Sequence, residues 1–312
     1  MVTSCNIPSA QNEERQIHRL GAASRIYGRA KVLMAVQFTL TVPAALVSSI
    51  LMAWQPTWKI WLTFISITIA LTDALCITRA LSKLKKRGAV IQQMFDCDMF
   101  QLPWNSLRCG SRPDTGEVKV DGVEHIQSTK SQDRLLNWYP PEVGKLPLWL
   151  ARIVCQRASF CWDLGQRDRV RGGLTGLLGL LAILVFLVAL LRGDSVQQMI
   201  LTVYVPLAPA VLWILREIIA QRDAIHAVER GLAATESTWK QALEGTIGES
   251  DASRQSILFQ DALFENRSRS PLVFNWIYQI IRKRKEAQMR STADDMVTEA
   301  VARLGLQLSS MK

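Results

Sequence analysis

The chain has 312 residues, a formal net charge of +10 and an apolar fraction of 49%. This length suits about two compact domains, and neither the apolar fraction nor the charge alone separates a soluble protein from a membrane protein. Six cysteines without CxxC spacing argue against a disulfide framework and against a cysteine-rich zinc site.

Four apolar stretches predict four transmembrane helices, at residues 32–54, 58–78, 174–191 and 196–220. About 20 apolar helical residues cross the hydrocarbon core of a bilayer. The second stretch contains Asp73, and the fourth contains Pro206 and Pro209, which neighbouring helices can accommodate. The first stretch follows a long polar arm and lacks a small-residue cleavage site, so we do not interpret it as a signal peptide.

Basic residues predict the orientation of these helices. All of them except Lys59 and Arg192 lie before the first stretch, between the second and the third, or from residue 216 onward. By the positive-inside rule these three parts face the cytoplasm, and both termini are expected inside the cell. The expected location is therefore a membrane, with the lipid bilayer as a direct partner.

We therefore predict an all-α membrane protein with four transmembrane helices arranged as two hairpins. A helical cytoplasmic domain would form from the connection between the second and third helices and from the C-terminal tail. The predicted segments are an N-terminal arm (1–31), a first hairpin (32–78), a cytoplasmic sensor segment (79–173), a second hairpin (174–220) and a helical C-terminal region (221–312).

The cytoplasmic segments carry helical signals separated by breaks. Helical periodicity is expected over 79–95 and again over 148–171, and the fourth stretch should continue as a helix to about residue 243. Residues 106–132 are polar and glycine-rich, which predicts a long loop or small hairpin, and three prolines exclude a regular helix over 137–147. Further predictions are a polar break at 246–253, a helix starting at Ser270-Pro271, and a last amphipathic helix over 294–308.

Catalytic motifs are absent from the sequence. The three histidines lie far apart, and no P-loop, GxSxG, HExxH or dinucleotide-binding glycine pattern occurs. Asp96 and Asp98 could act as paired carboxylates or hold a magnesium ion, but no phosphate-binding loop accompanies them. Pairing with the adjacent basic run, residues 83–87, is the simpler interpretation. We expect no enzymatic activity, no metal ion and no cofactor.

Four landmark sequences, in order, resemble one known family. They are FDCDMFQLPWN (95–105), NWYP (137–140), CQRASFCWDLGQRDRVR (155–171) and ENRSRSPLVFNWIYQIIRKRKE (265–286). The ordered set resembles the SMODS-associated four-transmembrane effector family over nearly the whole chain. The resemblance implies a pore-forming effector of CBASS, the cyclic-oligonucleotide-based antiphage signalling of bacteria. Such an effector would sense a cyclic nucleotide made by a CD-NTase and permeabilise the inner membrane, which kills or arrests the infected cell (abortive infection).

Arginine and aromatic residues alternate in the cytoplasmic sensor segment. Arginine suits phosphates and aromatic side chains suit flat bases, so a cyclic di- or trinucleotide could bind here, whereas no DNA or RNA polymer is expected. For each residue, packing or a local ion pair is the competing explanation, and Asp163 with Arg167 is most simply an i,i+4 helix pair. The predicted ligand contacts are Trp104, Asn105, Arg108, Trp138, Tyr139, Arg152, Arg157 and Trp162.

Polar residues inside the second stretch predict the lining of a conduit. Thr63, Ser66 and Asp73 recur on one helical face, and an ionisable residue within a span is a functional candidate by default. The alternative is that Asp73 lies near the inner leaflet and pairs with a basic residue such as Arg25 or Arg29.

Small residues in the third stretch predict close helix packing. Gly172, Gly176 and Gly179 allow a close approach that suits packing inside one protomer and equally suits assembly of several copies. Four helices are too few to enclose a wide channel, so a homo-oligomer is expected. The alternative function is a non-conducting membrane receptor or scaffold that docks a cytoplasmic protein partner.

Overall fold

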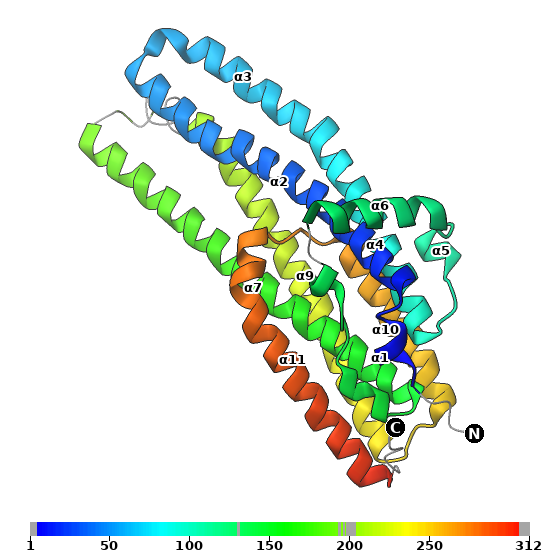
Figure 1. The fold of residues 1–312 in the computed structure, drawn as a ribbon. Coiled ribbons are helices and arrows are strands. Elements are labelled where there is room, and N and C mark those ends of the chain that lie inside the picture. Colours follow the sequence, from blue (N-terminus) through cyan, green and yellow to red (C-terminus); the bar gives the residue numbers. More distant parts are fainter. Residues whose placement is uncertain (1–4, 130–131, 193–194, 196, 198–203, 306–312) are drawn as a thin grey trace.

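The computed structural model describes residues 5–129, 132–192, 195, 197 and 204–305. Four long helical rods run side by side along most of an elongated bundle (Figure 1). One rod consists of three consecutive elements, with a π-helical turn in the middle. The rods are α2 (Glu14–Trp54), the series α3 (Lys59–Thr72), η2 (Asp73–Ile77) and α4 (Thr78–Phe100), then α7 (Leu148–Arg192) and α9 (Val205–Leu243).

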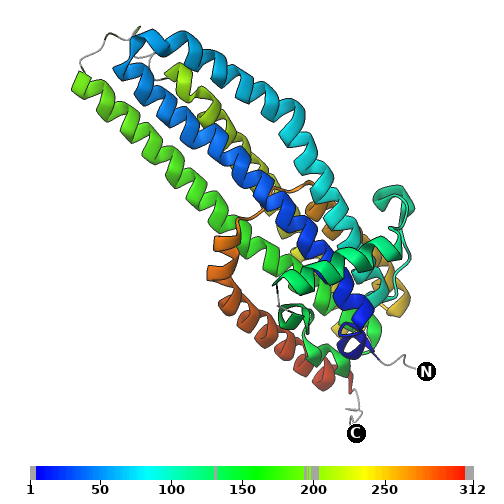
Figure 2. The same ribbon diagram turned by 45° about the horizontal axis from the view of Figure 1, so that its top comes forward.

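Shorter elements and two further helices surround one end of this bundle (Figure 2). We call this end, together with the elements around it, the body. Helix α10 packs against α4, α7 and α9, whereas α11 lies mainly along α7. The elements are α1 (Ile7–Ala10), α5 (Ser106–Cys109), α6 (Thr115–Thr129), α10 (Glu249–Arg269) and α11 (Asn275–Leu304), with 3-10 turns η3 (Gln132–Leu135) and η4 (Pro141–Lys145). The 3-10 turn η1 (Pro56–Trp58) joins α2 to α3 at the opposite end of the bundle (Figure 1).

Three helices among the described residues are long and apolar enough to cross a membrane: Glu14–Met52, Lys59–Phe100 and Leu148–Leu187. The described residues form helices and no strand, so the prediction of an all-α chain of membrane type is confirmed. The predicted fourth span lies partly outside the described residues, and its described portion is the start of α9. The arrangement as four spans in two hairpins therefore stays a prediction.

The rods continue without a break across the predicted segment boundaries. Helix α2 runs through residue 31, α7 through residue 173 and α9 through residue 220, and α4 follows directly on η2 at residue 78. Helices α4, α7 and α9 confirm the helices predicted over 79–95, 148–171 and up to residue 243. Each rod therefore connects the body to an apolar segment through continuous helical backbone.

The largest buried cluster lies in the body and holds its helices together. Phe95, Phe100, Tyr139, Leu150 and Ile153 are all essentially inaccessible to solvent. The Tyr139 ring lies 6.1 Å from the Phe95 ring and 5.1 Å from the Phe100 ring, between centroids. The non-helical NWYP segment is thus fixed in the core, where burying a large aromatic side chain contributes about 1.5–3 kcal/mol.

Residues 106–132 are mostly helical, so the prediction of a long loop or hairpin there is wrong. The carboxylate of Asp114 accepts a hydrogen bond from the Glu117 N–H (2.9 Å) and caps the start of α6. Gly122 lets α6 cross α2 closely, because a Cβ atom at this position would collide with the backbone of His18. The glycine that suggested a loop is required by a helix crossing.

The region after α10 also differs from the prediction. Ser270 ends α10 instead of starting a helix, and residues 270–274 form an extended connector to α11. The Lys85 ammonium donates to the Ser270 carbonyl (3.2 Å), and Arg167 donates to the Pro271 carbonyl (3.1 Å). These cations satisfy acceptors that a helix would have used internally. The two helices predicted after residue 270 are one helix, α11.

Candidate functional site

The predicted ligand contacts Trp104, Asn105 and Arg108 lie together at α5. The Asn105 amide donates to Asp261 Oδ2 (2.9 Å), and the Arg108 guanidinium lies 3.2 Å from Asp261 and 3.2 Å from Glu265. Both acids belong to α10, so this group joins α5 to α10. The Arg108 charge is already balanced by two carboxylates, which leaves it little excess positive charge for an anionic ligand.

Trp138, Tyr139 and Arg152 lie elsewhere in the body. Trp138 packs against the main core, and Tyr139 is only 2% exposed. Arg152, on α7, donates to Ser253 Oγ (3.3 Å) and to the Gln101 carbonyl (3.5 Å). In this arrangement Tyr139 presents no surface to a ligand, and its role is to pack the core and donate a hydrogen bond.

Arg157 and Trp162 form a third location, on α7 where it faces α11. Both line a cavity of about 70 Å³ together with Met289 and Thr292 of α11. Arg157 donates twice to one Glu236 oxygen, at 2.7 and 3.1 Å. Since ligand pockets usually measure about 300–1,000 Å³, this cavity is too small for a dinucleotide unless α11 moves. The eight predicted contacts therefore fall into three places and do not share one pocket.

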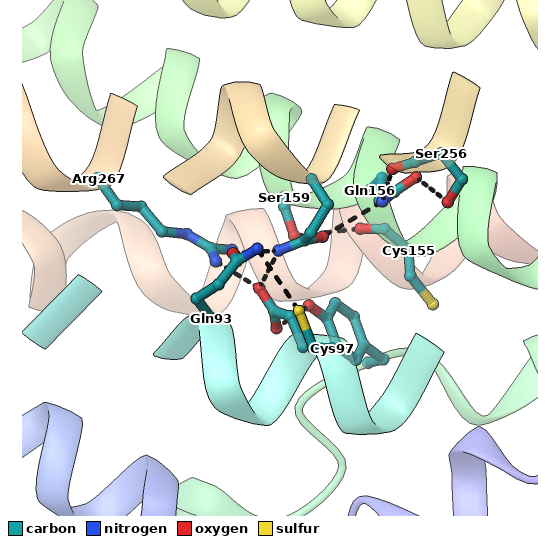
Figure 3. A network of polar contacts seen from close by, with 10 residues as sticks. Gln93, Cys97, Cys155, Gln156, Ser159, Ser256 and Arg267 are labelled. Carbon is teal, nitrogen blue, oxygen red and sulfur yellow. Dashed lines mark hydrogen bonds and ion pairs between the residues drawn. The ribbon is translucent and has the colours of Figure 1, made fainter. Parts of the chain in front are cut away.

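A buried polar network occupies the centre of the body and links α4, α7 and α10 (Figure 3). Asp96, on α4, is fully buried; its carboxylate pairs with the Arg267 guanidinium of α10 and accepts hydrogen bonds from the Tyr139 hydroxyl (2.7 Å) and the Gln260 amide (2.9 Å). Three further hydrogen bonds extend it: the Gln260 amide donates to Gln93 (2.8 Å), the Gln156 amide donates to Gln260 (3.2 Å), and the Ser256 hydroxyl donates to Gln156 (2.9 Å).

Electrostatics fix the protonation state of this network. Burial disfavours the charged Arg267 guanidinium, but the Asp96 charge outweighs burial and raises the pKa of Arg267. Burial and the Asp96 charge raise the pKa of the Tyr139 hydroxyl, which therefore stays protonated and donates. A buried ion pair whose oxygens are all hydrogen-bonded fixes the relative position of three helices.

The connector at residues 270–274 joins this network to the apolar half of the bundle. It follows α10 directly, and Val273 is buried in a cluster with Val42 and Leu207 of the apolar rods. The Phe274 ring contacts Phe38 of α2, with centroids 5.9 Å apart. A displacement of α10 therefore acts directly on side chains of α2 and α9.

Arg167 fixes the connector to the rods at this junction. Its guanidinium is 4% exposed and donates to Asp163 (2.8 Å), to Gln221 (3.3 Å) and to the Pro271 carbonyl (3.1 Å). The predicted i,i+4 pair of Asp163 and Arg167 is thus confirmed, and the same arginine also bonds α9 and the connector.

A cavity of about 370 Å³, lined mostly by apolar side chains with a few polar ones, lies between the apolar parts of α2, α3 and α9. Ser66 and Asp73 line it, and Thr63, the third predicted lining residue, is not among the residues that surround it. Asp73 is 8% exposed and belongs to η2, the π-helical turn. Such turns in helices are frequent at functional sites. The residues around the cavity are mostly small or apolar, with Thr41, Ser48 and Arg216 adding polarity.

Asp73 pairs with a basic residue, as the sequence-based alternative held, but the partner is Arg216 and not Arg25 or Arg29. Its carboxylate accepts a hydrogen bond from the Gln37 amide (2.5 Å) and lies 3.4 Å from the Arg216 guanidinium. Arg25, a proposed partner, instead pairs with Asp121 of α6. Gln37 is a polar residue in an otherwise apolar span, and this local signal could have identified it.

Asp96 and Asp98 also differ from the expected pairing with the adjacent basic run. Asp96 pairs with Arg267, and Asp98 pairs with Arg19 and Arg112. These arginines come from distant parts of the sequence, so no local pattern reveals them. Among the described residues no group of three His, Cys, Asp or Glu side chains is placed to hold a metal ion.

Gly172, Gly176 and Gly179 lie on an open face of α7. A Cβ atom added at any of the three would meet nothing within 4 Å. In the described part of the protomer this face therefore does not pack against another helix, and of the two uses predicted for it, close packing inside one protomer does not occur there.

Comparison with known proteins identifies the family of this chain. Residues 5–296 match the SMODS-associating 4TM effector domain. A probable CBASS effector molecule of Bacillus cereus (strain VD146) is 23% identical over 291 residues, which cover 89% of this chain and 94% of that protein. No solved structure matches the chain significantly. Because the family match extends over nearly the whole sequence, the chain belongs to the SMODS-associating 4TM effector family.

Proposed function

We propose that this chain is a CBASS effector that binds a cyclic oligonucleotide in the cytoplasm and then permeabilises the bacterial inner membrane. Its family and the name of its Bacillus cereus relative support a role in this antiphage defence. The cyclic oligonucleotide would come from a CD-NTase. The loss of the membrane barrier would stop the infected cell before the phage completes its cycle.

The observation that carries pore formation is the ion pair that borders a cavity inside the apolar half of the bundle. Ionisable residues within membrane segments are costly, usually pair or face a cavity, and mark ion pathways. Asp73 and Arg216 pair at 3.4 Å beside a cavity of about 370 Å³. In one protomer this cavity is a candidate for part of a closed conduit, which the active assembly would extend across the bilayer.

The connector and Arg167 supply the route from ligand to pore. The ligand would bind the body more tightly in the open or assembled form, because only differential affinity shifts the population of two states. A shift of α10 would move residues 270–274, which pack on the apolar rods. The bundle would then rearrange around the cavity.

Assembly of several copies would use the open glycine face of α7. Gly176 and its neighbours allow another helix to approach closely, which favours association in a membrane. Gly176→Leu should therefore reduce the cross-linked oligomer in bilayers by about tenfold, equivalent to roughly 1.4 kcal/mol. Ala182→Leu, on a different exposed face of α7, is the matched control. Unchanged oligomer in Gly176→Leu would show that this face contacts lipid.

Dye leakage from proteoliposomes tests the function directly. We expect leakage when cyclic di- or trinucleotides are added to the reconstituted full chain, and none with the corresponding mononucleotides. Ligand binding without leakage would contradict pore formation and would favour the non-conducting receptor or scaffold. The products recovered after incubation should be the unchanged cyclic nucleotides, because we propose that the chain has no enzymatic activity.

Labelling of an exposed α6 residue tests the orientation. Ser128→Cys should resist a membrane-impermeant maleimide in intact cells and react after lysis, if the body is cytoplasmic. Cys76 is exposed and Cys161 is half-buried, so both are replaced by serine in the labelled chain. The other native thiols are buried, and burial raises the pKa of Cys97 to about 12 and that of Cys109 to about 11, so they interfere little. Labelling in intact cells would place the body outside and would rule out a cytoplasmic ligand.

A further inference from the structure

Three arginines converge on one carboxylate at the far end of the body. Arg19 of α2 and Arg112 of the α5–α6 connection both pair closely with Asp98 of α4, and the Arg15 guanidinium lies 3.8 Å from the same carboxylate. Asp98 is the one carboxylate with which these arginines form ion pairs in the described part of the chain. The cluster therefore carries an excess of two positive charges.

The electrostatics of the cluster reflect this excess. Burial lowers the pKa of the Arg19 guanidinium, and although the Asp98 charge opposes that effect, the like charges of Arg15 and Arg112 add to it. Burial alone would raise the pKa of Asp98, but the hydrogen bonds and charges of Arg19 and Arg112 outweigh it and hold that pKa below its usual range. With one carboxylate for three guanidinium groups, the cluster has too little negative charge to be neutral.

Accessible donors remain in this cluster. The Arg112 side chain is 44% exposed and that of Arg15 65% exposed, whereas Arg19 is almost fully buried. Arg112 pairs with Asp98 through Nη2, and its guanidinium carries five N–H donors, so further donors are available. The indole of Trp104 lies 5.7 Å from the Arg112 guanidinium and positions it through a cation–π contact.

The position of the cluster excludes lipid as the source of the anion. Arg15 and Arg19 lie in the first two turns of α2, and Arg15 precedes the apolar stretch of α2 by about 25 Å at 1.5 Å per residue. Surface attraction to anionic lipid falls off within about 10 Å. A soluble anion can reach the cluster from the cytoplasm if the body lies there.

We propose that the outer donors of Arg15 and Arg112 bind a phosphodiester group of the cyclic oligonucleotide. That the ligand is cyclic rests on the proposed function, whereas the anion site rests on the arginine cluster alone. Guanidinium groups match phosphate oxygens with paired, charge-assisted hydrogen bonds. The phosphodiester supplies the missing negative charge, and Trp104 acts as a positioning residue for Arg112.

This location connects the ligand to two rods at once. Arg15 and Arg19 belong to α2 and Asp98 to α4, and each helix continues directly into an apolar segment. A phosphodiester on the outer donors also attracts Arg15 and Arg112 away from Asp98. It therefore competes with that carboxylate and weakens the contact between the body ends of these helices. Ligand binding therefore acts on the contact that holds α2 to the Lys59–Phe100 rod.

Calorimetry on the purified full chain tests the site, with inorganic pyrophosphate and a panel of cyclic and linear di- and trinucleotides as probes. Arg112→Gln should weaken the binding of pyrophosphate and of the active cyclic nucleotide by about tenfold, the loss of one charge-assisted hydrogen bond. Arg15→Gln should have a smaller effect in the same direction. The matched control is Arg87→Gln, an exposed arginine that is already neutralised by Glu117 and Asp121.

The direction in which Asp98→Asn changes ligand affinity distinguishes an anion site from a purely structural cluster. This substitution removes the competing carboxylate, so affinity for both probes should rise, whereas a cluster with a purely structural role would bind no better. If this variant does not fold, Arg15→Gln still tests the site, because Arg15 is exposed and loosely paired. Wild-type affinity in both arginine variants, or no binding of any probe by the wild type, would overturn the proposal.

Leakage measurements keep this proposal separate from the proposed function. If Arg112→Gln responds to the cyclic nucleotide as the wild type does, the arginine site is wrong and the pore function stands. If binding depends on Arg112 but causes no leakage, the pore function is wrong and the anion site stands. Equal affinity for linear and cyclic dinucleotides would overturn the assignment to a cyclic ligand.

Discussion

The two halves of the Lys59–Phe100 rod use similar apolar residues in opposite ways. In the apolar half, Ile60 is 81% exposed and Trp61 is 70% exposed, whereas in the body half Phe95 and Phe100 are completely buried. The body half is therefore held by the protein's own core. The apolar half depends on lipid, or on further copies of the chain, to cover its side chains.

Each half of this rod also contains one buried acidic residue. Protein groups surround the acid of the body half, whereas the acid of the apolar half borders a cavity. Asp96 is buried in a core where its oxygens make three contacts, with Tyr139, Gln260 and Arg267. Asp73 borders a cavity and pairs with Arg216, whose side chain is 59% exposed. The body thus surrounds its acid with fixed protein contacts, whereas the acid of the apolar half lies beside open space.

Loss of the Asp96 charge should give the largest fall in the free energy of unfolding. Asp96→Asn leaves Arg267 buried without a counter-charge, which should lower the free energy of unfolding by about 3–5 kcal/mol. Thermal unfolding in detergent measures this loss. Asp168→Asn breaks the exposed pair with Arg171 and should cost about 1 kcal/mol or less. Equal losses in the two variants would show that the body is not the more rigid region.

Loss of the Arg167 contacts should uncouple the two halves. Arg167→Gln removes the bond to the Pro271 carbonyl and should lower the leakage rate by about tenfold at equal ligand occupancy, within the usual coupling of about 1–3 kcal/mol. Calorimetry should show unchanged ligand affinity. Arg171→Gln, exposed and one turn away, is the control. A parallel loss of binding and leakage would mean that Arg167 supports the body as a whole.

Asp73→Asn should affect stability less than Asp96→Asn does and should mainly affect permeation. Its exposed arginine partner can be solvated, so the free energy of unfolding should fall by about 1 kcal/mol or less. Reversal potentials should show weaker preference for cations. Thr68→Val, on the exposed face of the same helix, is the control for both measurements. Currents indistinguishable from the wild type would remove Asp73 from the conduit.

Lowering the pH should cause the smallest change in stability, because it protonates Asp98. The arginines depress its folded-state pKa, so this contribution to stability is complete above the ordinary carboxyl value of 3.8 and is lost as the pH falls through the lower folded-state pKa. Below about pH 4 the wild type should therefore lose stability more steeply than Asp98→Asn. Melting curves at several acidic pH values measure the two slopes, and identical slopes would contradict the depressed pKa.

The sequence predicted the rods but not what joins them. Periodicity and apolar length were sufficient for α4, α7 and α9, because these features depend on residues close together in the sequence. Helix α6 was missed because Gly122 signals a loop locally, whereas the reason for the glycine is the crossing with α2. Likewise, Asp98 and Arg19 are 79 positions apart, and only the fold reveals such a pair.

The candidate sites likewise combine features that residue type predicts with contacts that only the fold reveals. Asp73 was identified because an acid within an apolar stretch is conspicuous, but its partner Arg216 lies in a different helix. Tyr139 was selected as an aromatic residue near arginines, although its position in the core depends on contacts with Phe95 and Phe100. Residue type indicated possible chemistry, and burial decided which side chains could reach a ligand.

The π-helical turn at Asp73–Ile77 has a geometric consequence for the two halves of its rod. Its wider backbone hydrogen bond, from the Thr78 N–H to the Asp73 carbonyl, accommodates one extra residue in a turn. One residue corresponds to about 100° of rotation in an α-helix. If the same residues formed an ordinary α-helix here, the lipid-facing stripe would be rotated by about that angle relative to the core-facing stripe, so the turn sets the angular phase between them.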